Sequence, residues 1–253
     1  MLKKYWLFAT SMIIISLITV FSFYNVLTPE KKLPIYQPSM VKFQLVDSTI
    51  QHVKRFHKID DFKLINQNND TVTNKIYDGK IYVADFFFTT CPGICPIMKE
   101  NMIDLQNEFI CDDQIMLLSH TVTPEIDSIS VLKDYSIKNG VLDSKWNLVT
   151  GDKKQIYNLA RKSYLVAEDI ESDLKYDMIH TENFVLIDPL RRIRGFYDGT
   201  SDDSIDKLIE DIYLLKQEFL IFAINLVFLL QYQKKHMQLM MQQSSMDTGS
   251  STR

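Results

Sequence analysis

The chain has few of the residues that define specialised classes of protein. Its 253 residues include 7 glycines, 7 prolines and 3 cysteines. Three cysteines cannot build a disulfide framework, and so little glycine and proline excludes collagen-like and low-complexity chains. An excess of positive charge is also absent: the net charge of −4 and the pI of about 5.7 argue against a nucleic-acid partner bound through its phosphates. With 46% hydrophobic residues, the composition is typical of a folded protein with a substantial core.

The longest uncharged run lies near the N-terminus, where Lys3 and Lys4 precede 23 residues without a charge, residues 5–27. A helix of that length spans roughly 35 Å, enough to cross the hydrocarbon core of a bilayer. Neither a small-residue cleavage pattern nor a cysteine for lipid attachment follows it. We therefore expect an uncleaved transmembrane signal anchor over residues 1–28 that leaves the lysines in the cytoplasm. The expected location is a bacterial cytoplasmic membrane, with a linker (residues 29–54) and the functional domain on the extracytoplasmic, periplasmic side.

A second apolar run, near the C-terminus, is shorter. Residues 219–233 hold no charge, and a helix of this length covers about 22 Å of a roughly 30 Å hydrocarbon core. We interpret the run as a continuation of the preceding helix that packs on protein or lies at the membrane surface. The alternative is a second span that ends at Lys234 and Lys235. A Met- and Ser-rich tail completes residues 218–253; its thioethers are acceptable Cu(I) ligands, but a plain tail is the simpler interpretation.

Strand-like and helix-like stretches alternate between residues 55 and 217. Period-2 and continuous apolar runs predict strands, and apolar stripes at helical spacing predict helices. Two hairpins are expected at residues 62–65 with 71–73 and at 184–187 with 193–197, further strands at 81–88, 115–121 and 148–149, and helices at 96–109, 126–138, 153–163 and 205–216. This order predicts one α/β domain over residues 55–217, a mixed sheet with helices on both faces.

Two of the three cysteines stand four residues apart in the run DFFFTTCPGICP (residues 85–96). This places Cys91 and Cys95 between a buried strand and the helix that it feeds, where reactive groups gather in α/β sheets. The positive end of a helix lowers thiol pKa values, and we expect Cys95, just before Pro96, to feel this most. Two thiolates that face each other can close a disulfide or hold a soft metal ion.

These residues resemble the Sco/SenC family, membrane-anchored and thioredoxin-like copper proteins of cytochrome c oxidase assembly. The resemblance rests on DFFFTTCPGICPIM and on His180, 85 residues beyond Cys95 and just before ENFVLID. It extends over about residues 55–217 through TVTPEID at 121–127, where Thr123 replaces a common aspartate, and GFYDG at 195–199. It implies a thioredoxin-like fold, with Cys91, Cys95 and His180 as ligands of one copper ion per domain. Two thiolates and an imidazole suit Cu(I) and tolerate Cu(II).

The resemblance also implies a function, delivery of copper to the dinuclear copper centre of cytochrome c oxidase or help in its maturation. The expected partners are the copper-bearing oxidase subunit, an extracytoplasmic copper donor or thiol reductant, and the membrane. The alternative is an extracytoplasmic thiol–disulfide oxidoreductase that acts on the oxidase subunit or another client, with Cys91 and Cys95 as its redox pair. A thioredoxin-fold peroxidase is a third hypothesis that the spacing does not exclude. A metallochaperone is not an enzyme and an oxidoreductase is, and the residues leave that choice open.

Four further features lie near the cysteines or near His180, or could bind a metal. Asp85 lies inside an apolar run, where it is either hydrogen-bonded structure or an auxiliary ligand or proton acceptor beside the thiols. His120 follows a strand near the same sheet edge, whereas Cys111 is expected to have no role. An acidic stretch, residues 168–177, precedes His180 and is either a solvated loop or a charged lid.

Overall fold

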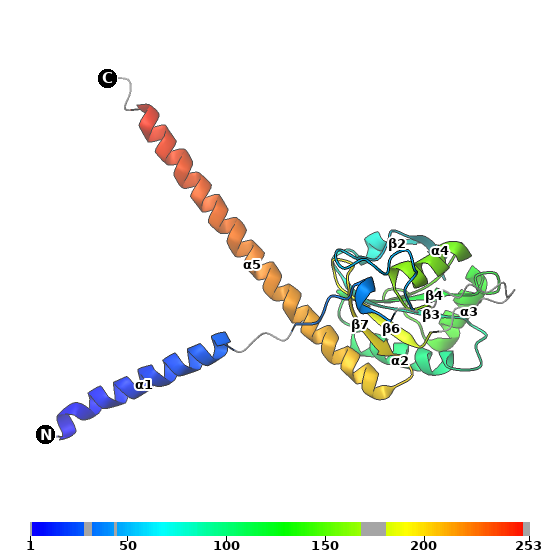
Figure 1. Ribbon diagram of the computed structural model, residues 1–253, viewed down its shortest axis with the longest axis horizontal. Helices are drawn as coiled ribbons and strands as arrows, with labels where there is room; N and C mark the ends of the chain where they lie inside the picture. The colour runs from blue at the N-terminus through cyan, green and yellow to red at the C-terminus, as the bar shows by residue number, and fades with distance from the viewer. Residues whose placement is uncertain (1, 28–31, 43–44, 168–180, 250–253) are drawn as a thin grey trace. The chain divides into compact units, whose positions relative to one another are not determined.

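The computed structural model describes residues 2–27, 32–42, 45–167 and 181–249 (Figure 1). The chain divides into two compact units, Met1–Lys32 and Leu33–Arg253. The first contains α1 (Leu2–Leu27), a helix whose described apolar side chains from Tyr5 to Phe23 are exposed. An apolar helix is therefore present where the sequence predicts the anchor.

The second unit is built on one seven-stranded sheet in the order β2-β1-β5-β4-β3-β6-β7. Its strands are β1 (Lys63–Asn66), β2 (Thr71–Thr73), β3 (Ile81–Phe87), β4 (Ile115–Thr121), β5 (Trp146–Thr150), β6 (Asn183–Ile187) and β7 (Ile193–Asp198). β3, β4 and β5 are parallel, whereas the β1–β2 hairpin and the β6–β7 hairpin are antiparallel to their neighbours. The predicted mixed sheet is confirmed, and the structure places the two predicted hairpins at its two edges.

The predicted helices also form, and their ends have local causes. They are α2 (Cys95–Glu108), α3 (Ile129–Asn139), α4 (Lys153–Asn158) with the π-helical turn η4 (Leu159–Ser163), and α5 (Asp202–Gly249). Two short 3₁₀ turns that the sequence did not predict, η1 (Pro38–Met40) and η3 (Asn74–Tyr77), also form. Ser128 caps α3 by accepting a hydrogen bond from Val131 N–H. Gly140 ends α3 with a φ of 71°, a conformation that glycine adopts without strain.

Two hydrophobic clusters cover the two faces of the sheet. On one face Val83 and Phe87 of β3 pack with α2, α3 and the first part of α5. On the other face Ala84 and Phe86 pack with α4, η4 and the N-terminal segments of the domain. Because both faces of β3 are covered, its sequence is almost continuously apolar, as parallel central strands require. Asp85 is the polar exception, on the α2 side of β3.

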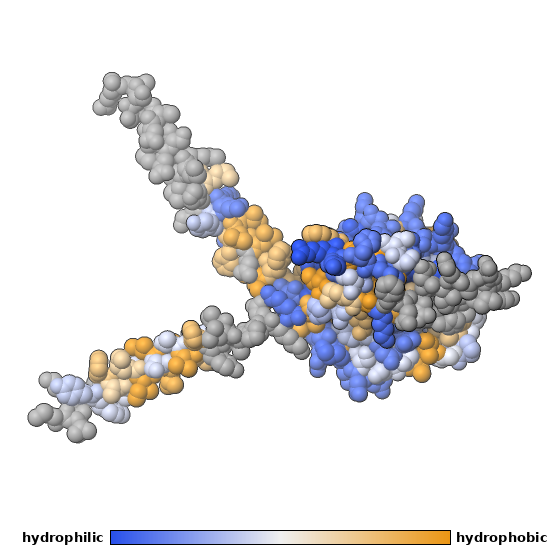
Figure 2. Space-filling view, viewed as in Figure 1, coloured by the Kyte–Doolittle hydropathy of each residue, from blue (hydrophilic) through white to orange (hydrophobic). Residues whose placement is uncertain are grey.

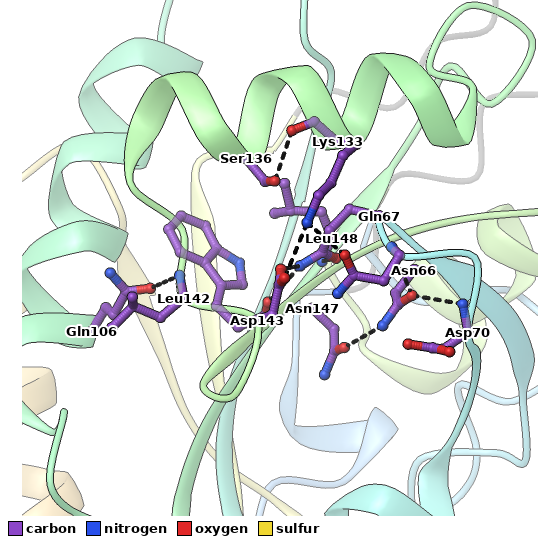
Figure 3. A network of polar contacts seen from close by, with 12 residues as sticks. Asn66, Gln67, Asp70, Gln106, Lys133, Ser136, Leu142, Asp143, Asn147 and Leu148 are labelled. Carbon is purple, nitrogen blue, oxygen red and sulfur yellow. Dashed lines mark hydrogen bonds and ion pairs between the residues drawn. The ribbon is translucent and has the colours of Figure 1, made fainter.

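A polar network ties the β1–β2 hairpin to the rest of the domain (Figure 3). The side chain of Gln67, just after β1, donates to Asp143 at 2.8 Å and accepts from Leu148 N–H of β5 at 2.9 Å. Lys133 of α3 forms an ion pair with Asp143 at 3.0 Å. These contacts fix the short hairpin against β5 and α3.

Helix α5 is much longer than the helix predicted over residues 205–216, with 48 residues. Its first part follows the prediction, since Ile205, Leu208 and Ile212 are buried against the sheet. Beyond Phe219 the large described apolar side chains are exposed, and Figure 2 shows an orange stretch of helix there. The expected continuation of the helix is therefore confirmed, but this apolar stretch does not pack on the described part of the domain.

A buried guanidinium joins three segments that are far apart in the sequence. Arg194 of β7 is 1% exposed, and its Nη2 donates to Leu33 O at 2.8 Å and to Glu218 Oε2 at 2.6 Å. Its Nη1 donates to Asp188 Oδ2 at 3.2 Å, and Asp188 is fully buried. The beginning of the domain and the last charged residue before the apolar stretch of α5 thus meet at one side chain.

Candidate metal centre

Both cysteines lie in the turn from β3 into α2, as the sequence predicts. The N–H of Cys91 donates to Phe88 O at 3.3 Å, which closes a turn just after the strand. Pro96 lies in the first turn of α2, where a missing N–H costs no helical hydrogen bond. Cys91 is half-buried, Cys95 is buried, and both are free thiols. The turn therefore presents one accessible sulfur with a second behind it.

The two thiols differ in acidity because one is hydrogen-bonded and the other is buried. Burial raises the pKa of Cys91, but hydrogen bonds from the backbone and thiol of Cys95 and from the N–H groups of Gly93 and Ile94 outweigh it and lower that pKa. Burial raises the pKa of Cys95, and its hydrogen bond to Cys91 and the nearby Asp85 charge add to this. The prediction that Cys95 benefits most from the helix terminus is therefore wrong, because the N–H groups there point at Cys91.

Asp127 braces the turn that leads to Cys91. This carboxylate is fully buried and accepts hydrogen bonds from the N–H of Thr89, at 3.3 Å, and from the hydroxyls of Thr89, Thr121 and Thr123. It links the end of β4 to the residue two positions before Cys91. Sequence reasoning did not single out Asp127, although it is the last residue of the TVTPEID run that carries the family resemblance.

Asp85 has a hydrogen-bonded position beneath the cysteine turn. It is 3% exposed and accepts from the hydroxyl of Ser119, the residue opposite it on β4. Ser119 in turn accepts from Trp146 Nε1 at 2.8 Å. Burial raises the pKa of Asp85 to about 7, although the Ser119 hydrogen bond opposes this shift. A carboxyl group that titrates near neutrality thus lies close enough to influence the Cys95 thiol.

We expect Asp85→Asn to increase the free energy of unfolding at pH 8 and to lose this gain as the pH falls toward 4. The pKa is about 7 in the folded protein, against 3.8 for an unperturbed aspartate. Between these values the folded protein holds a proton that the unfolded chain has released, so stability falls as pH rises. The difference between these two pKa values corresponds to about 4 kcal/mol of stability at high pH. Thermal unfolding at several pH values measures it, with Asp104→Asn on the exposed face of α2 as the control. A gain that is independent of pH would contradict the burial argument.

His120 is not brought to the cysteines. Its fully buried ring stacks on Phe86 at 4.8 Å between centroids and meets the edge of Tyr164 at 5.2 Å, on the sheet face opposite Cys95. Burial lowers its pKa to about 4, and its Nδ1 lies 3.3 Å from Asp85 O. Among the described residues its Nε2 has no hydrogen-bond partner. It is a neutral core histidine in an aromatic cage.

Two of the three predicted ligands are described. His180 and the acidic stretch before it lie outside the described residues. Within the described ranges, no three His, Cys, Asp or Glu side chains are grouped to hold a metal ion. Cys111 is exposed after the end of α2, and His57 contacts Ser163 O at 2.8 Å, away from the turn. The described site is therefore a dithiol, whose donor atoms fit a soft metal such as copper.

Comparison with known proteins identifies the same part of the chain. The sequence model of the SCO1/SenC family matches residues 50–216. The chain belongs to the SCO1/SenC family. The matched segment contains every strand of the sheet and both cysteines of the turn, which confirms the resemblance drawn from the sequence.

Three solved structures share this fold. BsSco, a member of the Sco family of cytochrome c oxidase assembly proteins in which a disulfide switch was identified, is 27% identical, with a TM-score of 0.54 over 63% of this chain and 93% of that chain. A SCO1/SenC family lipoprotein from Bacillus anthracis is 29% identical, with a TM-score of 0.56 over 63% and 95%. Bradyrhizobium japonicum ScoI, solved with copper bound, shares the fold at 22% identity and a TM-score of 0.51 over 63% and 99%. The predicted thioredoxin-like fold is confirmed.

Proposed function

We propose that this chain binds one copper ion through Cys91, Cys95 and His180 and delivers it to the dinuclear copper centre of cytochrome c oxidase. The observation that carries the proposal is the pair of free thiols at the β3–α2 turn, one half-buried and one buried. Thiolates and imidazole are the ligands that Cu(I) prefers. The copper bound to Bradyrhizobium japonicum ScoI and the assembly family of BsSco support the same assignment.

The path of β6 supports His180 as the third ligand. β6 runs antiparallel to β3, with Ala84 opposite Val185 and Tyr82 opposite Ile187. The start of β6 therefore lies at the sheet edge where β3 ends and the chain turns toward Cys91. Thr181, the first described residue after His180, is buried and accepts from Asn183 N–H at 3.2 Å. His180 directly precedes Thr181 in the chain, and this proximity in sequence supports it as the third ligand.

A second candidate function, thiol–disulfide exchange, is favoured by the lowered pKa of the half-buried Cys91. Its thiolate would attack a client disulfide, forming a mixed disulfide and releasing one client thiolate. Cys95 would then attack the Cys91 sulfur, release the second client thiol and leave a Cys91–Cys95 disulfide. The disulfide switch of BsSco supports this chemistry. Copper binding needs both sulfurs as thiolates, so one molecule cannot perform both functions at once.

The proposed location is the extracytoplasmic side of a bacterial cytoplasmic membrane, with α1 as an uncleaved anchor. Its apolar core, Phe8–Phe23, follows Lys3 and Lys4, which favour a cytoplasmic N-terminus. The Bacillus anthracis relative is a lipoprotein. In this chain the first cysteine is Cys91, inside the domain, so a helix would replace a lipid as the attachment.

We expect His180→Ala to weaken copper binding at least about tenfold, because loss of even an outer hydrogen-bond partner of a metal ligand costs roughly 10–100-fold in affinity. Titration of the reduced full chain with copper, followed by the sulfur-to-Cu(II) charge-transfer absorption, gives stoichiometry and affinity. One tightly bound copper per chain, weakened in this variant and unchanged in His52→Ala, a matched control at an exposed histidine of the linker, supports delivery of copper. Binding that is indifferent to His180, together with a readily cycled Cys91–Cys95 disulfide, would favour the oxidoreductase instead.

A further inference from the structure

The described side chains of the apolar stretch of α5 leave no polar side, and Asn225 is the single polar residue between Leu220 and Leu230. Between Leu220 and Leu230 the large described apolar side chains are 44–66% exposed. Successive residues are 100° apart around a helix, so these side chains cover its whole circumference. A helix that lies on a protein or on a membrane surface keeps one polar face toward water. This stretch keeps none, and its surroundings must be apolar on every side.

The stretch also has the length and boundaries of a membrane segment. Among the described residues, Asp202–Lys234 is long and apolar enough to cross a membrane by length and composition, and the apolar core of α1, Phe8–Phe23, is shorter. Charges bound the stretch, Glu218 before it and Lys234 after it. Its roughly 22 Å are shorter than an average hydrocarbon core, but lysine stems reach toward the headgroups and a bilayer thins around a short span.

The contacts of Arg194 link the start of this stretch to Leu33, at the beginning of the domain, which follows the proposed anchor in the chain. Arg194 Nη2 holds both Leu33 O and Glu218 Oε2, so the apolar stretch begins beside the first residue of the domain. The chain reaches Leu33 six residues after α1 ends at Leu27, and six residues span at most about 21 Å. A bilayer that holds α1 is therefore within reach of the point where α5 becomes apolar. Lys216, one turn earlier, is paired with Asp112, which keeps the preceding part of α5 on the domain.

We propose that residues 219–233 form a second transmembrane segment, which returns the chain to the cytoplasm at Lys234 and Lys235. This inference rests on the proposed membrane location of α1. The lysines at both ends of the membrane-bound chain then face the cytoplasm, as the positive-inside rule requires. Two spans then attach the domain to the membrane, and the chain leaves the domain toward them at Leu33 and Glu218, the two residues that Arg194 contacts. The methionines after His236 lie across the membrane from Cys91 and take no part in extracytoplasmic copper binding.

Two reporters on the full chain in bacterial cells test this topology. Green fluorescent protein fused after Arg253 becomes fluorescent only in the cytoplasm. Exposed Cys111, the sole thiol in a Cys91→Ser, Cys95→Ser background, is labelled by a membrane-impermeant maleimide only if the domain is outside. We expect a fluorescent tail together with a labelled Cys111.

Paired arginines provide the matched variants. Leu226→Arg with Leu229→Arg adds two charges at exposed positions inside the stretch, and fluorescence should be lost. Tyr232→Arg with Gln233→Arg adds the same charge next to Lys234, and fluorescence should persist. If the chain without arginine substitutions has a dark tail and a labelled Cys111, the second span is overturned. The stretch would then lie on the outer surface or on a second copy of the chain. An unlabelled Cys111 would instead overturn the extracytoplasmic location, and the second span with it.

Discussion

Replacing either Cys91 or Cys95 with serine is expected to abolish tight copper binding. A hydroxyl oxygen is a hard ligand that does not replace a thiolate for Cu(I). The loss should exceed the roughly 10–100-fold that removal of an outer partner costs a metal site. Competition with a chromophoric Cu(I) chelator measures the affinity of each variant.

Cys111→Ser is the matched control, since it also removes one thiol. Cys111 is exposed beyond the end of α2, so this variant should bind copper like the unsubstituted chain. Retention of tight binding by either Cys91→Ser or Cys95→Ser would show that copper is held elsewhere. Thermal unfolding of all three variants checks that a lost site is not a lost fold.

Arg194→Met is expected to lower the free energy of unfolding by about 3–5 kcal/mol, because it breaks a buried ion pair and leaves Asp188 with only the partly exposed Arg192 as a partner. The guanidinium contacts fully buried Asp188 at 3.2 Å. It also satisfies Leu33 O and Pro34 O at 2.8 and 3.1 Å. Methionine fills similar volume but makes none of these contacts. Denaturant unfolding monitored by tryptophan fluorescence measures the loss.

Arg192→Met separates this effect from a general loss of charge. Arg192 also contacts Asp188, with Nε at 2.7 Å, but its side chain is 24% exposed. Asp188 would keep Arg194 in that variant, so we expect a smaller loss, about 1 kcal/mol. Equal losses in the two variants would contradict the role given to burial.

The sheet could be predicted because the composition of each strand reflects which of its faces are buried. β3 is apolar at nearly every position since helices cover both of its faces, and the β1–β2 and β6–β7 hairpins have polar turns between apolar runs. The turn that holds Cys91 and Cys95 follows from the same pattern, a buried strand that runs directly into a proline-started helix.

Features that depend on distant segments could not be predicted. Arg194, Leu33 and Glu218 are separated by more than 20 residues at each step, and no local pattern pairs them. The acidities of the two cysteines were predicted in the wrong order, because the burial of Cys95 depends on how α2 packs. Helix α5 also continues to Gly249, through the Met- and Ser-rich segment that the sequence favours as a plain tail.

The ligand set of the bound copper is the central claim, and X-ray absorption at the copper edge of the reduced, copper-loaded full chain tests it most directly. The account predicts two sulfur ligands and one imidazole nitrogen, with the nitrogen missing in His180→Ala. A site with one sulfur or none, or a nitrogen that persists in His180→Ala, would contradict it.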